Sequence, residues 1–289
     1  MTDQPLRGLA AVVVGGSRGI GAAVAKLLAE LGAGVVVNGR DPNAVEQTVS
    51  SITAAGGSAV GLAGSAADRT VADSLIALCE NTFGGIDALV NCAGTAEPAG
   101  SSILTVDPAE FRELIDSHLG TVFNTCRAAA PRMVARGGGS IINTSSFAFL
   151  GDYGGTGYPA GKGAVNGLTM AIAAELAEHR VRANVVCPGA KTRLSTGADY
   201  EQHIATLRRR GLLDELSAHG ALHPAPAEYV APLYAYLAGP MSDRINGQMF
   251  VAAGGFVGRF GRPSPAPLGY RDHRDSPPWT LAEIAAMLT

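Results

Sequence analysis

The stretch LAAVVVGGSRGIGAAVAKLL, residues 9–28, decides the fold of this chain. Its first part, Leu9–Val14, is a short apolar run that predicts a buried strand. Its second part begins a segment, Ile20–Leu31, in which apolar residues recur at helical spacing. A strand that leads through a glycine-rich turn into a helix is the first unit of a nucleotide-binding α/β sheet.

The turn itself has glycine where a dinucleotide site needs it. Gly15 permits the tight turn, Gly19 lets the backbone approach a pyrophosphate, and Gly21 lets the helix pack closely on the strand. The helix N-terminus offers free N–H groups and a positive dipole to the phosphates. An ordinary glycine turn is the alternative, and the strand before and helix after this turn favour dinucleotide binding.

The same strand and helix unit recurs along the chain. Strands flanked by helices of ten or more residues predict a parallel sheet covered on both faces. The right-handed crossover rule then favours an α/β fold with a Rossmann-type doubly wound parallel sheet, helices on both faces, in a single domain over residues 1–255. The further strands are expected at Val35–Asn38, Val60–Leu62, Ala88–Asn91, Ser140–Ser145, Ala183–Cys187 and, last, Met249–Ala252, with helices at Asn43–Ala55 and Asp68–Phe83.

Two regions depart from this pattern. Residues 191–226 contain helix-like pieces and no strand, and they are interpreted as a lid-like insertion over the substrate. Residues 256–289 form a C-terminal extension, in which Arg259–Pro278 is a loop rich in Pro, Gly and Arg. The last residues, Trp279–Thr289, predict a helix too short to be stable alone in water. We expect it to dock on a neighbouring subunit or near the mouth of the active site.

Composition excludes several classes of protein. The 289 residues include 22 basic and 25 acidic side chains, a net charge of −3, so no broad basic surface is available for nucleic acid. The four cysteines form no C-x-x-C pair, which argues against a disulfide framework or a zinc site and favours a reduced, cytoplasmic setting without a metal. No membrane segment is expected, because the apolar run near the start is short. Only three lysines occur, so the position of each is informative.

Taken together, the motifs resemble the short-chain dehydrogenase/reductase family over about Leu6 to Gly255. The order and the spacing of the motifs agree with that family at the same time, and the resemblance implies that these residues bind a nicotinamide cofactor. They are Gly15, Ser17, Arg18, Gly19, Ile20 and Gly21 in the first turn, Asn91, Ala93 and Gly94 in Asn91-Cys92-Ala93-Gly94, Tyr158 and Lys162, and Pro188, Gly189 and Thr192.

Tyr158 and Lys162 lie four residues apart at the start of a predicted helix, so their side chains share one face. A phenol with a pKa of about 10 is a poor acid or base near neutral pH, and an adjacent ammonium group stabilises its phenolate. The resemblance implies that Lys162 also holds the nicotinamide ribose and that Tyr158 gives a proton to the carbonyl oxygen. A serine hydroxyl bonds that same oxygen.

The catalytic serine is either Ser145 or Ser146. Counting from the predicted strand favours Ser146, whereas counting back from the tyrosine favours Ser145. We prefer Ser146, because the end of a strand is better defined than the length of the glycine-rich loop at residues 151–157.

His118 stands where the family has an asparagine that holds a water of the proton relay. A histidine can offer the same backbone carbonyl, or its imidazole, titrating at about pH 6.5, can join the relay as a catalytic group. A histidine that satisfies only local hydrogen bonds is the alternative.

The end of the second strand indicates which cofactor is bound. An NAD(H) site usually has an acid there, and this chain has Gly39. Arg18 and Arg40 can converge on a 2′-phosphate, so NADP(H) is expected rather than NAD(H). The family often has an aspartate near the adenine after the third strand, where this chain has Gly64 and Ser65, so Ser65 or the backbone is expected to contact the adenine.

The sequence therefore favours an NADPH-dependent reductase of a ketone or β-ketoacyl-type carbonyl, reversible as an alcohol dehydrogenase. The expected partners are a small-molecule carbonyl or alcohol and other copies of the chain in a homotetramer or homodimer. An epimerase or dehydratase on the same fold and a nucleotide-sensing regulatory protein are the alternatives. The run Arg208-Arg209-Arg210 either meets an anionic carrier of the substrate or is a solvated helix face.

Overall fold

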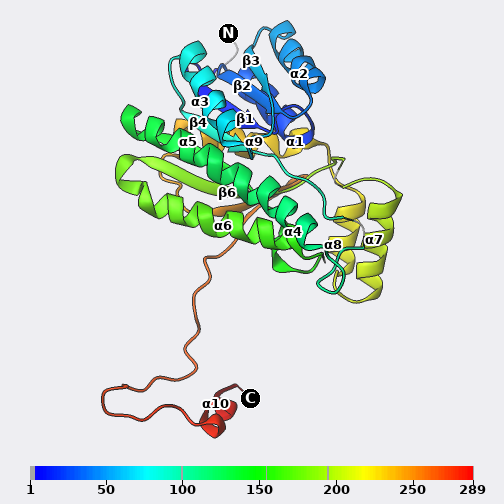
Figure 1. Ribbon diagram of the computed structural model, residues 1–289, viewed down its shortest axis with the longest axis vertical. Helices are drawn as coiled ribbons and strands as arrows, with labels where there is room; N and C mark the ends of the chain where they lie inside the picture. The colour runs from blue at the N-terminus through cyan, green and yellow to red at the C-terminus, as the bar shows by residue number, and fades with distance from the viewer. Residues whose placement is uncertain (1–3, 99, 154, 194, 289) are drawn as a thin grey trace.

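A single eight-stranded sheet organises the molecule, in the order β3-β2-β1-β4-β5-β6-β7-β8 (Figure 1). The computed structural model describes residues 4–288 except residues 99, 154 and 194. Strands β1 to β7 pair in parallel, and β8 pairs antiparallel to β7. The strands are β1 (Ala10–Val14), β2 (Gly34–Gly39), β3 (Ser58–Ala63), β4 (Ala88–Asn91), β5 (Gly139–Thr144), β6 (Val181–Gly189), β7 (Met249–Ala253) and β8 (Phe256–Arg259).

Helices cover both faces of this sheet. The described α-helices are α1 (Gly19–Glu30), α2 (Pro42–Ala54), α3 (Arg69–Phe83), α4 (Pro108–Ile115), α5 (Thr121–Arg136), α6 (Gly157–Glu175), α7 (Ala198–Arg209), α8 (Glu215–Leu222), α9 (Ala231–Ala238) and α10 (Leu281–Leu288). A π-helical turn, η1 (Asp116–Gly120), joins α4 to α5, and the 3₁₀ turns are η2 (Phe147–Leu150), η3 (Ala177–His179), η4 (Ala227–Tyr229) and η5 (Pro240–Ser242).

Successive side chains of each strand point to opposite faces of the sheet, so the sheet divides the hydrophobic core into two parts. Val13 packs with α1, α2 and α9 on one face, whereas the next residue back, Val12, packs with α3, α5 and α6 on the other. Both side chains are fully buried. The predicted Rossmann-type parallel sheet with helices on both faces is therefore confirmed.

The prediction fails at the last edge of the sheet. Met249–Ala252 was expected to be the final strand, and β8 follows it after a turn of two residues. Gly254 has a φ of +55°, so it can form this tight turn, and the chain pairs back on β7 in an antiparallel ladder. The sequence pattern of the four residues Phe256–Arg259 was too short to distinguish from the loop that follows.

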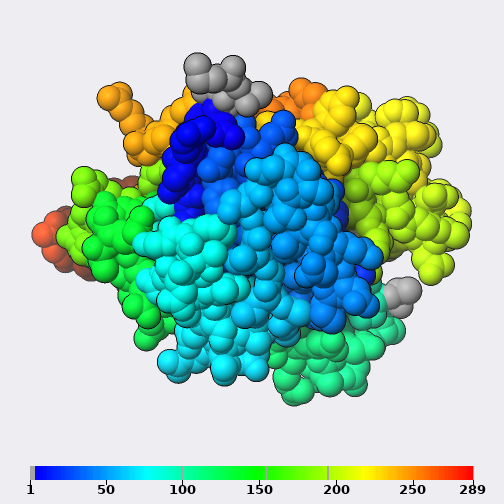
Figure 2. Space-filling view, turned by 90° about the horizontal axis from the view of Figure 1, so that it is seen from above, coloured from blue at the N-terminus to red at the C-terminus, as the bar shows by residue number. Residues whose placement is uncertain are grey.

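Residues 191–226 form two helices, α7 and α8, as expected. They enclose a small core of their own, built on Ile204, Leu207 and Leu213, which are all buried. Seen from above in Figure 2, the first three strand and helix units, in blue and cyan, fill the middle of the face, and these helices, in yellow-green and yellow, lie at one side. They stand apart from the main sheet and its two cores.

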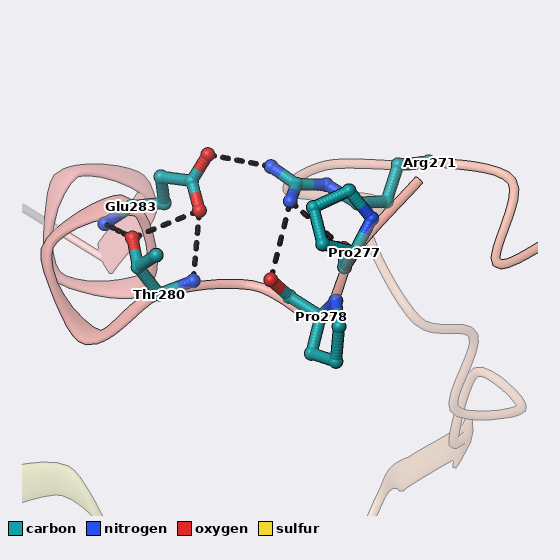
Figure 3. A network of polar contacts seen from close by, with 5 residues as sticks. All are labelled: Arg271, Pro277, Pro278, Thr280 and Glu283. Atoms are coloured by element: carbon teal, nitrogen blue, oxygen red, sulfur yellow. Dashed lines mark hydrogen bonds and ion pairs between the residues drawn. The ribbon is translucent and has the colours of Figure 1, made fainter. Parts of the chain in front are cut away.

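The C-terminal segment extends away from the body of the molecule (Figure 1). Its end is ordered by its own contacts: the Arg271 guanidinium lies 3.5 Å from the centre of the Trp279 ring. The same guanidinium pairs with Glu283 at 2.6 Å (Figure 3). Thr280 and Glu283 form a reciprocal capping box at the start of α10. Trp279 was expected within the last helix and lies before it, because the cap begins the helix at Leu281.

A membrane-spanning helix requires a long apolar segment. In the part of the chain that the structure describes, no helix is long and apolar enough to cross a membrane.

Candidate active site

The carboxyl ends of β1 and β4 place two glycine-containing turns side by side. The strand order reverses direction between β1 and β4, which is where doubly wound sheets bind nucleotides. A Cβ atom added to Gly15 would lie 2.6 Å from the backbone N of Ala93, so the close approach of the two turns requires glycine at residue 15. A Cβ on Gly21 would lie 2.2 Å from the carbonyl oxygen of Gly15, so the close packing of α1 against this turn requires glycine at residue 21.

The N-terminus of α1 is suited to hold a pyrophosphate. Asp41, Asp68 and Asp107 each cap the helix that follows them, α2, α3 and α4, through a side-chain oxygen. At α1 the capping position is Arg18, which makes no such hydrogen bond, and the first turn carries no acidic residue. The N–H groups and the dipole of α1 therefore remain for an anion, as a dinucleotide requires.

Arg18 has a carboxylate partner that the sequence did not suggest. Its guanidinium forms an ion pair with Asp41, two residues after Gly39. Hydrogen bonding from Arg18, together with the backbone N–H groups of the α2 cap, lowers the pKa of Asp41 below its usual range. Arg40 is exposed, and Gly39 lies against Ser17, whose Oγ is 2.2 Å from an added Cβ.

A buried asparagine shapes the turn after β3, where the adenine is expected. The Asn38 amide donates to the carbonyl oxygens of Leu62 at 3.0 Å and Gly64 at 3.1 Å. Gly64 has a φ of +151°, and Ser65 beside it is exposed. The Ser65 hydroxyl is therefore accessible at this edge of the sheet.

The end of β6 closes the other side of the glycine turn. Thr192, just beyond Pro188 and Gly189, places its Cγ2 3.4 Å from a Cβ added to Gly19. The turn after β6 and the turn after β1 thus face each other across a narrow space.

Tyr158 and Lys162 lie in the first two turns of α6, as predicted. The Lys162 Nζ donates to the carbonyl oxygen of Thr144 at 3.0 Å and lies 5.7 Å from the centre of the Tyr158 ring. Burial lowers the pKa of Lys162 to about 8.

The pKa of Tyr158 does not follow the expectation. Burial raises it, and a hydrogen bond with the Ser146 side chain offsets only part of that rise. We expected the Lys162 ammonium to lower this pKa. Its Nζ is instead held by Thr144, so the cost of burying a phenolate is larger than any stabilisation from the ammonium.

The two candidate serines have different surroundings. The Ser146 side chain acts on the Tyr158 phenol, whose pKa it lowers, and its hydroxyl accepts from the backbone N–H of Ala148 at 3.2 Å. The Ser145 hydroxyl is buried and donates to the carbonyl oxygen of Lys162 at 3.2 Å. Ser146 is therefore the serine beside the tyrosine hydroxyl.

His118 lies in the π-helical turn η1 and packs edge-on against Tyr158, with ring centres 4.9 Å apart. Its Nε2 pairs with the carbonyl oxygen of Thr95 at 3.1 Å, and its buried Nδ1 has no hydrogen-bond partner among the residues that the structure describes. Burial first, and then the charge of Lys162, lower the pKa of His118 to about 3. The expectation that the His118 imidazole titrates at about pH 6.5 is therefore wrong, because the ring is neutral at physiological pH.

The side chain of Asn91 belongs to a buried polar network. Its amide donates to the Asn143 side chain at 2.9 Å and its oxygen accepts from Thr125 at 2.9 Å. Asn143 in turn donates to Thr169 at 3.0 Å. These bonds join β4, β5, α5 and α6 beneath the site, so only the backbone of Asn91 remains for a cofactor.

Sequence reasoning missed Glu97, which lies in the loop after β4. Its carboxylate accepts hydrogen bonds from the backbone N–H groups of Thr156, Gly157 and Tyr158. A lone acid about sixty residues before the tyrosine carries no signal in the sequence, because only the fold brings the two segments together.

The arginine run at the end of α7 has partners within residues 191–226. Arg208 pairs with Glu215 at 2.9 Å, and Arg209 donates to the Thr206 hydroxyl at 3.0 Å. Both contacts are exposed, which favours the solvated helix face over a binding site for an anionic carrier.

A doubly wound sheet with an uncapped helix after its first strand and a Ser, Tyr and Lys group at its carboxyl edge is typical of a nicotinamide-dependent oxidoreductase. Comparison with known proteins agrees with this class. The model of the short chain dehydrogenase family matches residues 9–201.

The chain is similar to several proteins of that family. It is 39% identical over 187 residues to a 3alpha-hydroxysteroid dehydrogenase of Mediterraneibacter gnavus, covering 64% of this chain and 74% of that protein. It is 34% identical to the hydroxyacyl-CoA dehydrogenase ChsB1 of Mycobacterium tuberculosis, covering 98% and 88%. A crystal structure of a short chain dehydrogenase from Mycobacterium avium superposes with a TM-score of 0.80 at 30% identity, covering 98% and 96%.

The chain therefore belongs to the short-chain dehydrogenase/reductase family. It is an NAD(P)(H)-dependent oxidoreductase that acts on hydroxyl and carbonyl groups.

Proposed function

We propose that this protein is an NADPH-dependent reductase of a ketone or β-ketoacyl-type carbonyl, reversible as an alcohol dehydrogenase. The observation that carries the proposal is the convergence of Ser146, Tyr158 and Lys162 at the carboxyl edge of the sheet. An intact group of this kind argues against a purely regulatory, nucleotide-sensing protein.

The proton comes from Tyr158. When bound, NADPH supplies the hydride that reduces the carbonyl carbon. Because burial raises the pKa of Tyr158, its phenol stays protonated near neutral pH and can donate to the carbonyl oxygen as negative charge develops there. The Ser146 hydroxyl, close enough to the phenol to lower its pKa, can bond to the same carbonyl oxygen.

Lys162 and His118 support this step. With a pKa of about 8, Lys162 is mostly charged at pH 7 and can bind the ribose hydroxyls through its remaining donors. The neutral His118 keeps its Nδ1 as an acceptor within a short distance of Gly94 and Lys162. We assign this nitrogen to a water-mediated proton path, in place of the family's asparagine.

The preference for NADP(H) rests on the charges at the end of β2. Gly39 provides no carboxylate to repel a 2′-phosphate, and Arg18 and Arg40 flank it. Arg18 must exchange Asp41 for the phosphate, and because both side chains are nearly half exposed, that ion pair costs little to break.

A shallow, open depression of about 510 Å³ beside the start of α6 supports a proposal for the substrate class. It is lined by Ile103, Val106, Pro108, Phe111, Arg112 and Thr156. Similar proteins are named for hydroxysteroids and hydroxyacyl-CoA, both of which place the reacting group on a large apolar skeleton. A carbonyl on a bulky apolar molecule fits this lining.

The test is oxidation of NADPH, followed by its absorbance, with 3-ketosteroids, β-ketoacyl thioesters and simple cyclic ketones. Wild type should turn over at least one of these compounds, and Tyr158→Phe should bind NADPH normally without turnover. Tight NADPH binding with no turnover of any carbonyl would overturn the reductase proposal and favour a non-redox enzyme on the same fold.

A further inference from the structure

The helix that carries Tyr158 and Lys162 begins without a cap of its own. The residue before it, Thr156, makes no side-chain hydrogen bond to the first turn. The first N–H groups of any helix need acceptors, and a buried helix end without them is costly. Helices α2, α3 and α4 each take theirs from an aspartate immediately before the helix.

Glu97 supplies the acceptors for α6 from another part of the chain. Its Oε1 accepts from the N–H of Thr156 at 3.1 Å and of Gly157 at 3.2 Å, and its Oε2 accepts from the N–H of Tyr158. One carboxylate therefore holds three consecutive N–H groups, including that of the tyrosine itself.

The surrounding residues hold this carboxylate in place. The Ser101 hydroxyl donates to its Oε1 at 2.7 Å. A Cβ added to Gly155 would lie 3.0 Å from both Cγ and Cδ of Glu97, and Gly155 has a φ of +81°. Glycine thus permits the close approach of the loop before α6 to the Glu97 side chain.

The Glu97 carboxyl is ionised in this setting. Burial raises its pKa, but the hydrogen bonds from Ser101 and from the three backbone N–H groups lower it further, so the net change is downward. A carboxylate at a helix N-terminus also meets the positive end of the helix dipole.

We propose that Glu97 is a positioning residue of this active site. It fixes the first turn of α6, and with it the placement of the Tyr158 phenol relative to Ser146 and the substrate carbonyl, without touching either substrate or cofactor. It also ties the loop after β4, whose Gly94 borders His118 and Lys162, to the helix that carries the tyrosine. The kinetic part of this proposal rests on the proposed function; the structural part does not.

The test compares Glu97→Ala and Glu97→Gln with Asp87→Ala. Asp87 is the matched control, because its carboxylate also accepts a backbone N–H, that of Ala10 at 2.8 Å, and pairs with Arg136 at the opposite edge of the sheet. Each variant is measured for kcat, KM, NADPH affinity, melting temperature and amide hydrogen exchange across residues 155–163.

We expect Glu97→Ala to lower kcat by ~10- to 100-fold, since a misplacement of about 1 Å can cost that much, with NADPH affinity changed less than ~3-fold. Glu97→Gln, which keeps one acceptor oxygen, should retain an intermediate kcat. Exchange at the start of α6 should accelerate in both Glu97 variants and stay unchanged in Asp87→Ala, which should lose stability and keep its kcat.

Two results would overturn the proposal. One is a folded Glu97→Ala variant with wild-type kcat and wild-type exchange at the start of α6. The other is a raised KM for the carbonyl compound with unchanged kcat, which would place the carboxylate on the substrate. If wild type turns over no carbonyl, the reductase proposal fails, and the exchange measurement still decides whether Glu97 holds α6.

Discussion

Arg18 and Asp41 form an ion pair at the edge of the proposed 2′-phosphate site. The same Asp41 carboxylate caps α2 by accepting from the N–H groups of Asn43 and Ala44. One side chain therefore both begins a helix and competes with the cofactor for an arginine. The expected preference for NADPH therefore depends on whether the 2′-phosphate replaces Asp41 as the partner of Arg18, which can be measured.

Replacing Asp41 by asparagine should strengthen NADPH binding. Asparagine caps helices about as well as aspartate, so α2 is retained while the competing charge is removed. We expect the Kd for NADPH to fall by ~3- to 10-fold, because an exposed ion pair competes only weakly for Arg18, and the Kd for NADH to stay the same. Fluorescence titration measures both. Arg18→Ala should weaken NADPH selectively; equal effects on both cofactors would contradict the assignment.

Reductase activity should decline in alkaline solution as Lys162 loses its proton. Its pKa is lowered to about 8, so the ammonium is present below that pH and lost above it. Tyr158, with its raised pKa, stays protonated throughout this range and does not set the limit. The pH profile of kcat/KM for carbonyl reduction should therefore fall through about pH 8. In Lys162→Arg, whatever its absolute rate, the alkaline decline of kcat/KM should occur at a much higher pH. A decline at the same pH as in wild type would exclude Lys162 as its source.

Alanine at the two serines should separate their roles. Ser146 pairs with the Tyr158 side chain, and its loss should lower kcat by ~10²- to 10³-fold, as for loss of an oxyanion donor. Ser145 donates to the carbonyl oxygen of Lys162, and its loss should cost about 1 kcal/mol of stability with a smaller effect on kcat. Steady-state kinetics and thermal unfolding test this, and the reverse order of kcat values would move the catalytic role to Ser145.

His118 should make the protein sensitive to acid. The pKa of the folded state is about 3, below the usual 6.5, so the unfolded chain binds the proton more readily. Stability is fully present well above pH 6.5 and is lost as the pH falls, with a total loss of about 2 kcal/mol by pH 5 from this one group. Urea unfolding at several pH values should show that the free energy of unfolding falls more steeply with decreasing pH in wild type than in His118→Asn. The same pH dependence in both proteins would mean that protonation of the His118 ring does not destabilise the folded state.

The C-terminal segment should act in association between chains. Its ion pairs and cap stay within the segment, while Leu281 is 90% and Leu288 69% exposed. The similarities to ChsB1 and to the Mycobacterium avium structure extend over 98% of the chain, so they include most of this segment. Pro263, Pro265 and Pro267 stiffen the stretch that leads to it and hold it away from its own body.

Deleting residues 263–289 should reduce the assembled mass in light scattering and leave the sheet domain folded. Leu281→Asp should weaken assembly in the same way. Glu228→Ala, on the surface of the body, is the control and should assemble normally. A deletion that assembles as a full oligomer with full activity would refute a docking role for this segment.

The sequence by itself determined the features that depend on short spacing. The glycine turn, the strand and helix units and the Tyr158–Lys162 pair are all encoded within windows of a few residues, because local periodicity decides which side chains share a face. These were enough for the fold, the family and the candidate catalytic pair. Even β8 was missed only because four residues carry too little pattern.

The tertiary structure alone decided the partners at the edge of the sheet. The pairing of Arg18 with Asp41 and of Glu97 with the start of α6 joins segments that follow different strands. Which loops meet depends on strand order and helix packing over the whole chain. The neutral state of His118 has the same origin, since its pKa follows from burial, and burial is a property of the assembled core.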